Sequence, residues 1–69
     1  MPFIQVVLME GRTPEQKEQL IEKLSETASE VLHAPLEAVR VHLIETPPTH
    51  WGIAGKSVAK RRELEHVKD

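Results

Sequence analysis

The pattern of apolar and polar positions divides this chain into a strand, a helix and a second strand. Residues 2–9 are nearly all apolar and rich in β-branched side chains, which is typical of a strand covered on both faces. From Leu20 to Leu32, apolar residues recur at three- and four-residue steps with charged residues between them. That spacing predicts one amphipathic helix of about five turns. The run from Val39 to Glu45 alternates and predicts the second strand.

The start of the helix is marked by a turn and a capping pattern. Gly11 supplies the turn after the first strand. Thr13 suits the N-cap, Pro14 suits the first helical position, and Gln16 can complete a capping box. We therefore expect the helix to begin at Pro14.

Proline and glycine residues mark the ends of the remaining predicted elements. Pro35 ends the helix, and His33 before it is interpreted as a capping residue. Pro47 and Pro48 end the second strand, because proline offers no backbone donor. The other expected segments are a single turn over 36–38, a hairpin or bulge over 50–55, a final helical turn within 56–62 and a polar, mobile tail over 63–69.

A strand, a helix of roughly 20 residues and a strand form a β-α-β unit, which requires parallel strands and a right-handed crossover. We therefore predict an α/β (α+β) fold with one domain over residues 1–62, completed by the short C-terminal hairpin. The alternation of the second strand predicts a face of Val39, Val41 and Leu43 toward the helix and an opposite face of Arg40, His42 and Ile44.

Such a unit leaves one sheet face and both sheet edges open. With 69 residues and no cysteine, the chain has a small core and no disulfide to reinforce it. We therefore expect it to gain stability by forming an oligomer. On the open face Arg40 would then be partly buried and would need an anionic partner.

Composition excludes several classes of protein. The net charge of −2 argues against a general nucleic-acid binder. No window approaches the ~18 apolar residues of a membrane span, and no charged-then-apolar signal segment opens the chain. The absence of cysteine fits a reducing compartment. We expect a soluble cytoplasmic protein with no nucleic-acid or membrane partner.

Pro2 is the first candidate for chemistry. Its compact side chain favours removal of Met1, which would leave a secondary amine fixed by its own ring. With Met1 attached, the Pro2 nitrogen is an amide and cannot act as a base. Most Met-Pro starts carry no function, so this feature has little weight alone.

Two arginines and one tryptophan are the other candidates, and each has a plain structural interpretation. Arg12 could be a solvated loop cation, and Arg40 could pair with Glu37 or Glu45. Trp51, the only tryptophan, is more often a core or interface anchor than a ligand contact.

Five segments carry a resemblance to a known family. They are Met-Pro-Phe-Ile-Gln-Val, Leu-Met-Glu-Gly-Arg, Glu-Gln-Lys, Ala-Pro-Leu-Glu-Ala-Val-Arg-Val and His-Trp-Gly-Ile-Ala-Gly. In this order they resemble the 4-oxalocrotonate (2-hydroxymuconate) tautomerase family, in its short, single β-α-β form. The resemblance runs from Pro2 to about Arg62.

The resemblance implies a reaction and an assembly. The amino-terminal Pro2, exposed by loss of Met1, would be the catalytic base that moves a proton within an enolic acid such as 2-hydroxymuconate. Arg40 of a neighbouring subunit would bind the 2-hydroxy or 2-keto carboxylate, and Arg12 would hold the distal carboxylate. The subunits would assemble as a homohexamer, a trimer of dimers.

The resemblance also implies an apolar pocket lining. Trp51 stands where the family usually has phenylalanine, and Ile53 and Met9 would complete the lining. The partner would be a small enol or keto acid, with no cofactor and no metal, since the carbonyl of the substrate accepts the electrons.

Physical chemistry supports Pro2 as a base. An ordinary α-amino group has a pKa near ~8 and is mostly protonated at pH 7. Two nearby arginines and an apolar wall both disfavour the ammonium form and lower the pKa of the amine. The same arginines would stabilise negative charge on the substrate oxygen.

Other interpretations compete with this one. A zinc site is disfavoured because no two of the four histidines have i, i+4 spacing. A hydratase or dehalogenase would need a carboxylate to activate water, for which Glu10 and Glu45 are the candidates. The same proline amine could serve a biosynthetic substrate with one carboxylate or an aromatic ring. A non-catalytic oligomeric scaffold of this fold is the alternative from another class.

Overall fold

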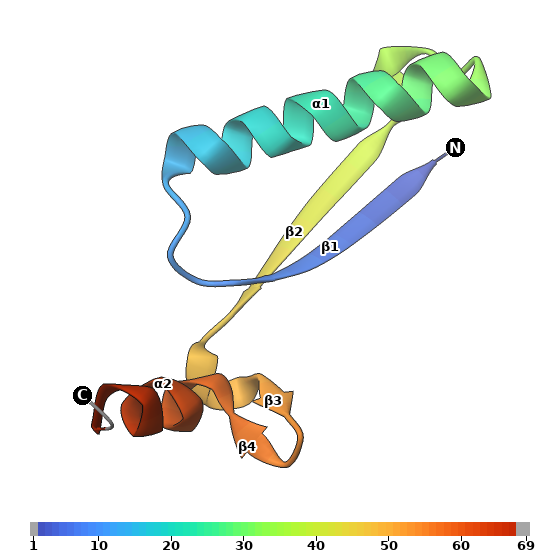
Figure 1. The fold of residues 1–69 in the computed structure, drawn as a ribbon. Helices are drawn as coiled ribbons and strands as arrows, with labels where there is room; N and C mark the ends of the chain where they lie inside the picture. Colours follow the sequence, from blue (N-terminus) through green and yellow to red (C-terminus); the bar gives the residue numbers. More distant parts are fainter. Residues whose placement is uncertain (1, 68–69) are drawn as a thin grey trace.

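The computed structural model describes residues 2–67 and consists of a β-α-β unit followed by a small C-terminal module (Figure 1). The elements in order are β1 (Phe3–Met9), α1 (Pro14–Leu32), the 3-10 turn η1 (Leu36–Ala38), β2 (Arg40–Thr46), the 3-10 turn η2 (Pro48–His50), β3 (Gly52–Ile53), β4 (Lys56–Ser57) and α2 (Val58–Val67). The predicted strand, helix, turn and strand are confirmed, each to within a residue or two of its expected bounds.

Strands β1 and β2 form a two-stranded parallel sheet, with Phe3 opposite Arg40 and Met9 opposite Thr46. Helix α1 covers one face of this sheet (Figure 1). The predicted parallel pairing is therefore confirmed. Because the strands are parallel, Pro2 and the start of β2 share one end of the sheet, and the end of β1 lies at the other.

Both ends of α1 have the local geometry that their sequence predicts. The backbone N–H of Gln16 donates to Thr13 Oγ1 at 3.1 Å, and the N–H of Thr13 donates to Gln16 Oε1 at 3.0 Å. This is the expected capping box. His33 caps the carboxyl end in the left-handed conformation, with φ 54°, and its N–H donates to the carbonyl of Ser29. The interpretation of His33 as a capping residue is confirmed.

The two faces of the sheet differ in exposure. Val39, on the face toward α1, is the one buried hydrophobic residue in the described part of the chain, at 8% exposure. On the opposite face Phe3 and Val7 are 62% and 56% exposed, and Arg40 and His42 are exposed as well. The strand that we expected to be covered on both faces is thus covered on only one in a single chain, because the chain has one helix to place against it.

The C-terminal module, residues 47–67, contains the expected hairpin. Strands β3 and β4 pair antiparallel across a two-residue turn, Ala54-Gly55, whose φ values are 54° and 85°. Two successive positive φ values are typical of the tight turn whose twist matches a hairpin. The sequence located this turn through its glycines.

Helix α2 corrects the expectation for the end of the chain. Lys56 and Ser57 form β4 rather than a helical turn, and Glu63 to Val67 continue α2 instead of forming a mobile tail. Residues 58–67 contain no glycine or proline and are rich in good helix formers. The Ser57 hydroxyl also accepts the N–H of Lys60 at 3.1 Å, as a cap does. Residues 68–69 of the expected tail lie outside the described residues.

The molecule is elongated, with principal extents of 50 × 24 × 16 Å. The Cα radius of gyration is 16.3 Å, whereas a compact chain of this length would have about 11 Å. Figure 1 shows the reason, because the C-terminal module stands apart from the β-α-β unit beyond the end of β2. Among residues 2–67, no helix combines the length and apolar character that a membrane crossing needs.

Candidate active site

Pro2 and Arg40 lie together at the amino end of the sheet. The backbone N–H of Arg40 donates to the carbonyl of Pro2 at 3.0 Å, which extends the ladder of β1 and β2 by one residue. Pro2 is half-buried. This hydrogen bond fixes the main chain around the Pro2 nitrogen. Met1, whose removal we predicted, lies outside the described residues.

The guanidinium of Arg40 binds one of the two residues that we considered as partners, but through its main chain. Arg40 Nη1 donates to the main-chain carbonyl of Glu37, not to its carboxylate. The carboxylate of Glu45 is occupied by Lys17, whose Nζ lies 3.2 Å from each of its oxygens. Arg40 therefore forms no ion pair with a carboxylate among the side chains that the structure describes. It remains on the exposed sheet face, available to bind an anion.

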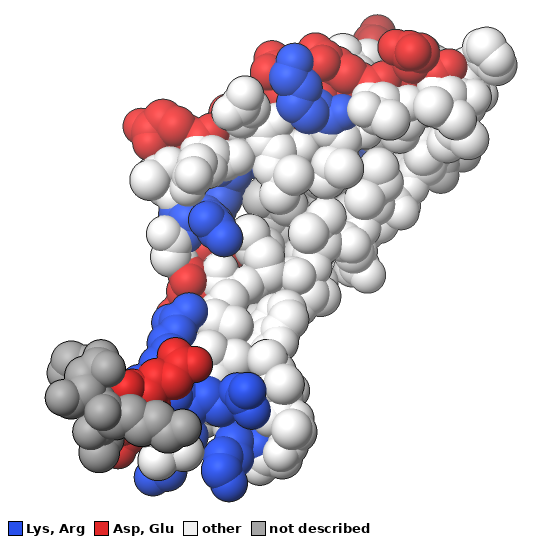
Figure 2. All heavy atoms as spheres, viewed as in Figure 1, with Lys and Arg blue, Asp and Glu red and all other residues white. Residues whose placement is uncertain are grey.

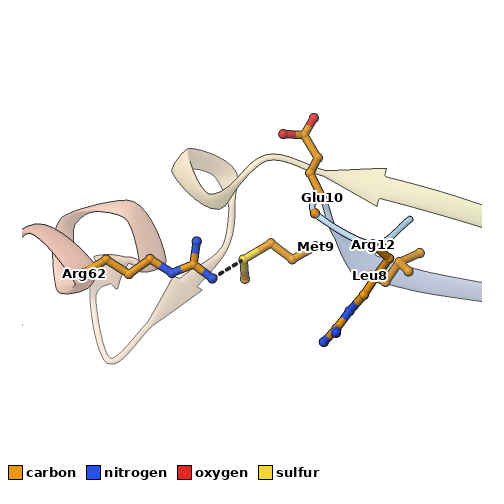
Figure 3. Close-up of a pocket in the computed structure, with 6 residues that line it drawn as sticks. Leu8, Met9, Glu10, Arg12 and Arg62 are labelled. Atoms are coloured by element: carbon orange, nitrogen blue, oxygen red, sulfur yellow. Dashed lines mark hydrogen bonds between the residues drawn. The ribbon is translucent and has the colours of Figure 1, made fainter. Parts of the chain in front are cut away.

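Met9 and Arg12 lie at the carboxyl end of the sheet. Gly11, which lies between these two residues in the sequence, has φ 126°, a conformation that favours glycine and turns the chain sharply after β1. The turn borders an open hollow of about 470 Å³ (Figure 3). The residues that line this hollow are Leu8, Met9, Glu10, Gly11, Arg12 and Arg62.

Arg62 is a lining residue that the sequence did not single out. It comes from α2, and its Nη2 lies 3.6 Å from the Sδ of Met9, across 53 positions of sequence (Figure 3). The neighbouring Arg61 has the same chemistry and borders a different hollow. Arg61 and Arg62 differ only in the side of α2 on which each lies. Our sequence prediction ended the helical turn at residue 62, so it gave no basis for separating the two.

Trp51 and Ile53 belong to the C-terminal module and do not line the hollow at Arg12. Trp51 is half-buried, and its carbonyl accepts the N–H of Val58 at 2.7 Å. Ile53, in the hairpin, is 47% exposed. A single chain therefore does not gather the predicted apolar lining of Trp51, Ile53 and Met9 into one wall.

The predicted site residues thus fall into groups at opposite ends of the sheet. Pro2 and Met9 are seven strand positions apart, which at about 3.3 Å per residue is roughly 23 Å. That span is much longer than a six-carbon diacid. Within one chain, the structure brings Pro2 together with Arg40 and Met9 together with Arg12, but it does not bring the two pairs together.

Charge is distributed unevenly over the molecule. In Figure 2, acidic side chains gather over α1 and basic side chains gather over the C-terminal module. The acidic residues of α1 are Glu15, Glu18, Glu22, Glu26 and Glu30, and the basic residues of the module are Lys56, Lys60, Arg61 and Arg62. The hollow at Arg12 therefore lies beside the basic end of the molecule.

Comparison with known proteins decides the family. The family model described as tautomerase enzyme matches residues 2–61. The chain belongs to the tautomerase family. A 2-hydroxymuconate tautomerase of Pseudomonas sp. (strain CF600) is 50% identical over 62 residues, which cover 90% of this chain and 98% of that protein. The predicted membership is confirmed, and the chain is an isomerase of the tautomerase type.

Solved structures of the family share the fold. TomN, a 4-oxalocrotonate tautomerase homologue in the tomaymycin biosynthetic pathway, matches with a TM-score of 0.87 and 50% identity, over 90% of this chain and 95% of that chain. A heterohexamer 4-oxalocrotonate tautomerase from Chloroflexus aurantiacus matches with a TM-score of 0.83 and 40% identity, over 87% and 97%. The predicted tautomerase-like β-α-β fold is therefore confirmed.

Proposed function

We propose that this tautomerase interconverts the enol and keto forms of a 2-hydroxy-dienoate such as 2-hydroxymuconate, without a cofactor. The observation that carries the proposal is the pair of arginines, Arg40 and Arg12, at the two ends of the sheet. Neither forms an ion pair with a carboxylate among the described side chains. Two available guanidinium groups suit a substrate with two carboxylates. The name of the 50%-identical relative supports the same substrate.

In the proposed mechanism, Pro2 is the general base after removal of Met1. Its amine accepts a proton from one atom of the substrate and returns a proton to a carbon farther along the conjugated chain. The double bonds shift by one position, and no electrons are gained or lost. Arg40 of a neighbouring subunit binds the carboxylate and oxygen at the reacting end, where negative charge develops. Arg12 holds the distal carboxylate, and Trp51, Ile53 and Met9 exclude water.

The proposed site is shared between subunits of an oligomer, in line with the predicted homohexamer. Pro2 and Arg12 of one chain are too far apart to act on one small substrate. A second copy that runs antiparallel across an open sheet edge brings its Arg12 toward Pro2 of the first. The exposed apolar face around Phe3 and Val7 offers further surface for assembly. The heterohexamer from Chloroflexus aurantiacus supports a six-subunit assembly.

The test of this function combines mass and kinetics. Intact mass of protein from the native host is expected to lack Met1. Pro2→Ala is expected to lower kcat for ketonisation of 2-hydroxymuconate by about 10²–10⁴, the usual contribution of a general base. Arg40→Ala is expected to cost on the order of 10²–10³. Light scattering should give the same assembly size for both variants and the wild type.

Two outcomes would contradict the proposal in different ways. Retained Met1 together with an inactive wild type favours the non-catalytic scaffold. An active wild type whose rate is unaffected by Pro2→Ala leaves the tautomerase activity but removes Pro2 as its base.

A second substrate class has support of its own. TomN belongs to a biosynthetic pathway, and the resemblance implies that Trp51 stands at a position where the family usually has phenylalanine. A larger indole would change the shape of the pocket and could suit a substrate with one carboxylate. The ratio of kcat/KM for a diacid enol to that for a mono-acid enol separates the two classes, with a ratio well above one expected for the proposed function.

A further inference from the structure

We propose that Lys17 keeps Arg12 available to the substrate by occupying the carboxylate of Glu45, and that Lys17 is therefore a positioning residue of the proposed reaction. This inference rests on the proposed function, in which Arg12 holds the distal carboxylate. Neither Lys17 nor Glu45 has a role in the mechanism above.

The first support is the way in which the chain around Arg12 is held. Before Arg12, the N–H of Glu10 donates to the carbonyl of Thr46 at 3.0 Å. After Arg12, Nζ of Lys17 in the first turn of α1 lies 3.2 Å from each carboxylate oxygen of Glu45. The segment between these two contacts, which includes Arg12, is thus held at both ends to consecutive residues of β2.

The second support is that both cations border the same space. A second hollow, of about 240 Å³, lies at the start of α1 and is lined by Leu8, Arg12, Gln16, Lys17 and Leu20. Leu8 is directly opposite Glu45 in the parallel ladder, where neighbouring strands are about 4.8 Å apart. Glu45 is therefore one strand spacing from a residue that lines the hollow of both cations.

The third support is the distribution of charge between these cations. Lys17 takes both oxygens of Glu45, whereas Arg12 forms no ion pair among the described side chains. In Figure 3 the side chain of Glu10, the acidic residue nearest to Arg12 in the sequence, extends in the opposite direction from that of Arg12. A guanidinium binds a carboxylate through two parallel N–H···O bonds. Without Lys17, Glu45 would lose its cation, and Arg12 is the neighbouring group that could replace it.

This arrangement makes the two halves of the ion pair unequal. A contact that only joined α1 to β2 would be lost to the same extent in either single variant. Under our inference, loss of Lys17 leaves a carboxylate that competes with the substrate for Arg12, whereas loss of Glu45 leaves no competitor. The change in KM for a diacid therefore distinguishes a positioning role from a structural one.

The experiment measures Lys17→Met, Glu45→Gln and the double variant on 2-hydroxymuconate, a diacid. Lys17→Met is expected to raise KM about two- to fivefold with little change in kcat, which is the factor by which a partly exposed ion pair would hold Arg12 back. Glu45→Gln should not raise KM, and the double variant should restore the wild-type KM. The mono-acid 2-hydroxy-2,4-pentadienoate has no distal carboxylate, and its KM should be unchanged in all three variants.

Lys23→Met is the matched control, because it removes a lysine from the same helix and breaks the ion pair with Glu26. It should leave KM for both substrates near wild type. Lys17→Arg should also do so, because it keeps Glu45 occupied. Lys17→Gln replaces Lys17→Met if light scattering shows that the latter assembles poorly, and the same rise in KM is expected. In an Arg12→Ala background, Lys17→Met should have no further effect, since no guanidinium is left to capture.

The outcomes separate this inference from the proposed function. If the wild type turns over the diacid, Arg12→Ala raises its KM and Lys17→Met does not, only this inference is overturned. Equal rises in KM for Lys17→Met and Glu45→Gln, without recovery in the double variant, would make the ion pair structural and would also overturn it. If the wild type turns over neither substrate, or if Arg12→Ala leaves KM for the diacid unchanged, the proposed function or its role for Arg12 is wrong, and this inference is wrong with it.

Discussion

At the scale of single residues, Lys17 is the cation that joins the helix to the sheet, because its Nζ lies 3.2 Å from both carboxylate oxygens of Glu45. Arg40 is thereby left without that carboxylate, and its Nη1 donates to the main-chain carbonyl of Glu37. A helical period assigns Lys17 to the polar positions between the apolar ones. It cannot show that the first turn of α1 overhangs the end of β2, where Lys17 meets Glu45.

The Lys17–Glu45 ion pair makes a residue-scale prediction about stability. Both side chains are partly shielded, at 29% and 36% exposure, and the pair joins α1 to β2. A double-mutant cycle with Lys17→Met and Glu45→Gln should give a coupling free energy of about 0.2–1 kcal/mol, and it should decrease in high salt. The measurement is urea unfolding at fixed protein concentration.

The ion pair Lys23–Glu26 provides the matched control. Its atoms are 3.6 Å apart within α1, and its side chains are more exposed. We expect a coupling at the low end of the range for helical neighbours, about 0.2 kcal/mol. If this pair couples as strongly as Lys17 and Glu45, the link between α1 and β2 adds nothing beyond an ordinary surface contact.

At the scale of elements, sequence succeeded where the cause is local. The capping box at Thr13, the stop at Pro35 and the alternation of β2 all depend on neighbouring residues, and the structure contains each of them. It failed at α2, where a high charge content suggested a mobile tail. Alanine, lysine, arginine, glutamate and leucine are also strong helix formers, and composition alone does not separate the two outcomes.

The hairpin makes an element-scale prediction. Gly55 has φ 85°, and no atom lies within 4 Å of the position that a Cβ would take. Gly55→Ala should therefore destabilise the protein by conformational strain rather than by collision, at a cost of about 1–2 kcal/mol. The readout is the urea midpoint of the assembly.

Gly52 is the matched control for that change. It lies in β3, also has open space around its Cβ position, and has no left-handed φ. Gly52→Ala should leave the urea midpoint close to that of the wild type. Equal losses for the two variants would mean that the hairpin senses side-chain volume, and the strain explanation would have to be abandoned.

At the scale of the whole molecule, sequence predicted that a single chain would leave surfaces open and form an oligomer. It did not predict how the subunits are arranged. Open sheet faces and edges follow from a β-α-β unit, and the structure adds a radius of gyration of 16.3 Å. A predicted strand over residues 2–9 already places Pro2 and Arg12 at opposite ends of the sheet. The structure contains this strand as β1, a single extended element between them. The arrangement of the subunits depends on surfaces whose partners are other copies of the chain.

A shared site predicts that two inactive variants restore each other. Pro2→Ala and Arg12→Ala should each be impaired as pure assemblies on 2-hydroxymuconate. After equal amounts are unfolded together and refolded, random mixing gives about one quarter of the shared sites an intact Pro2 from one chain and an intact Arg12 from another. Activity should therefore rise well above that of either pure variant, while refolded Pro2→Ala alone shows no gain.

Native mass spectrometry verifies that mixed assemblies form. If they form and no activity returns, Pro2 and Arg12 do not act across a subunit boundary. The elongated chain would then have to bend by roughly 20 Å to close a site of its own.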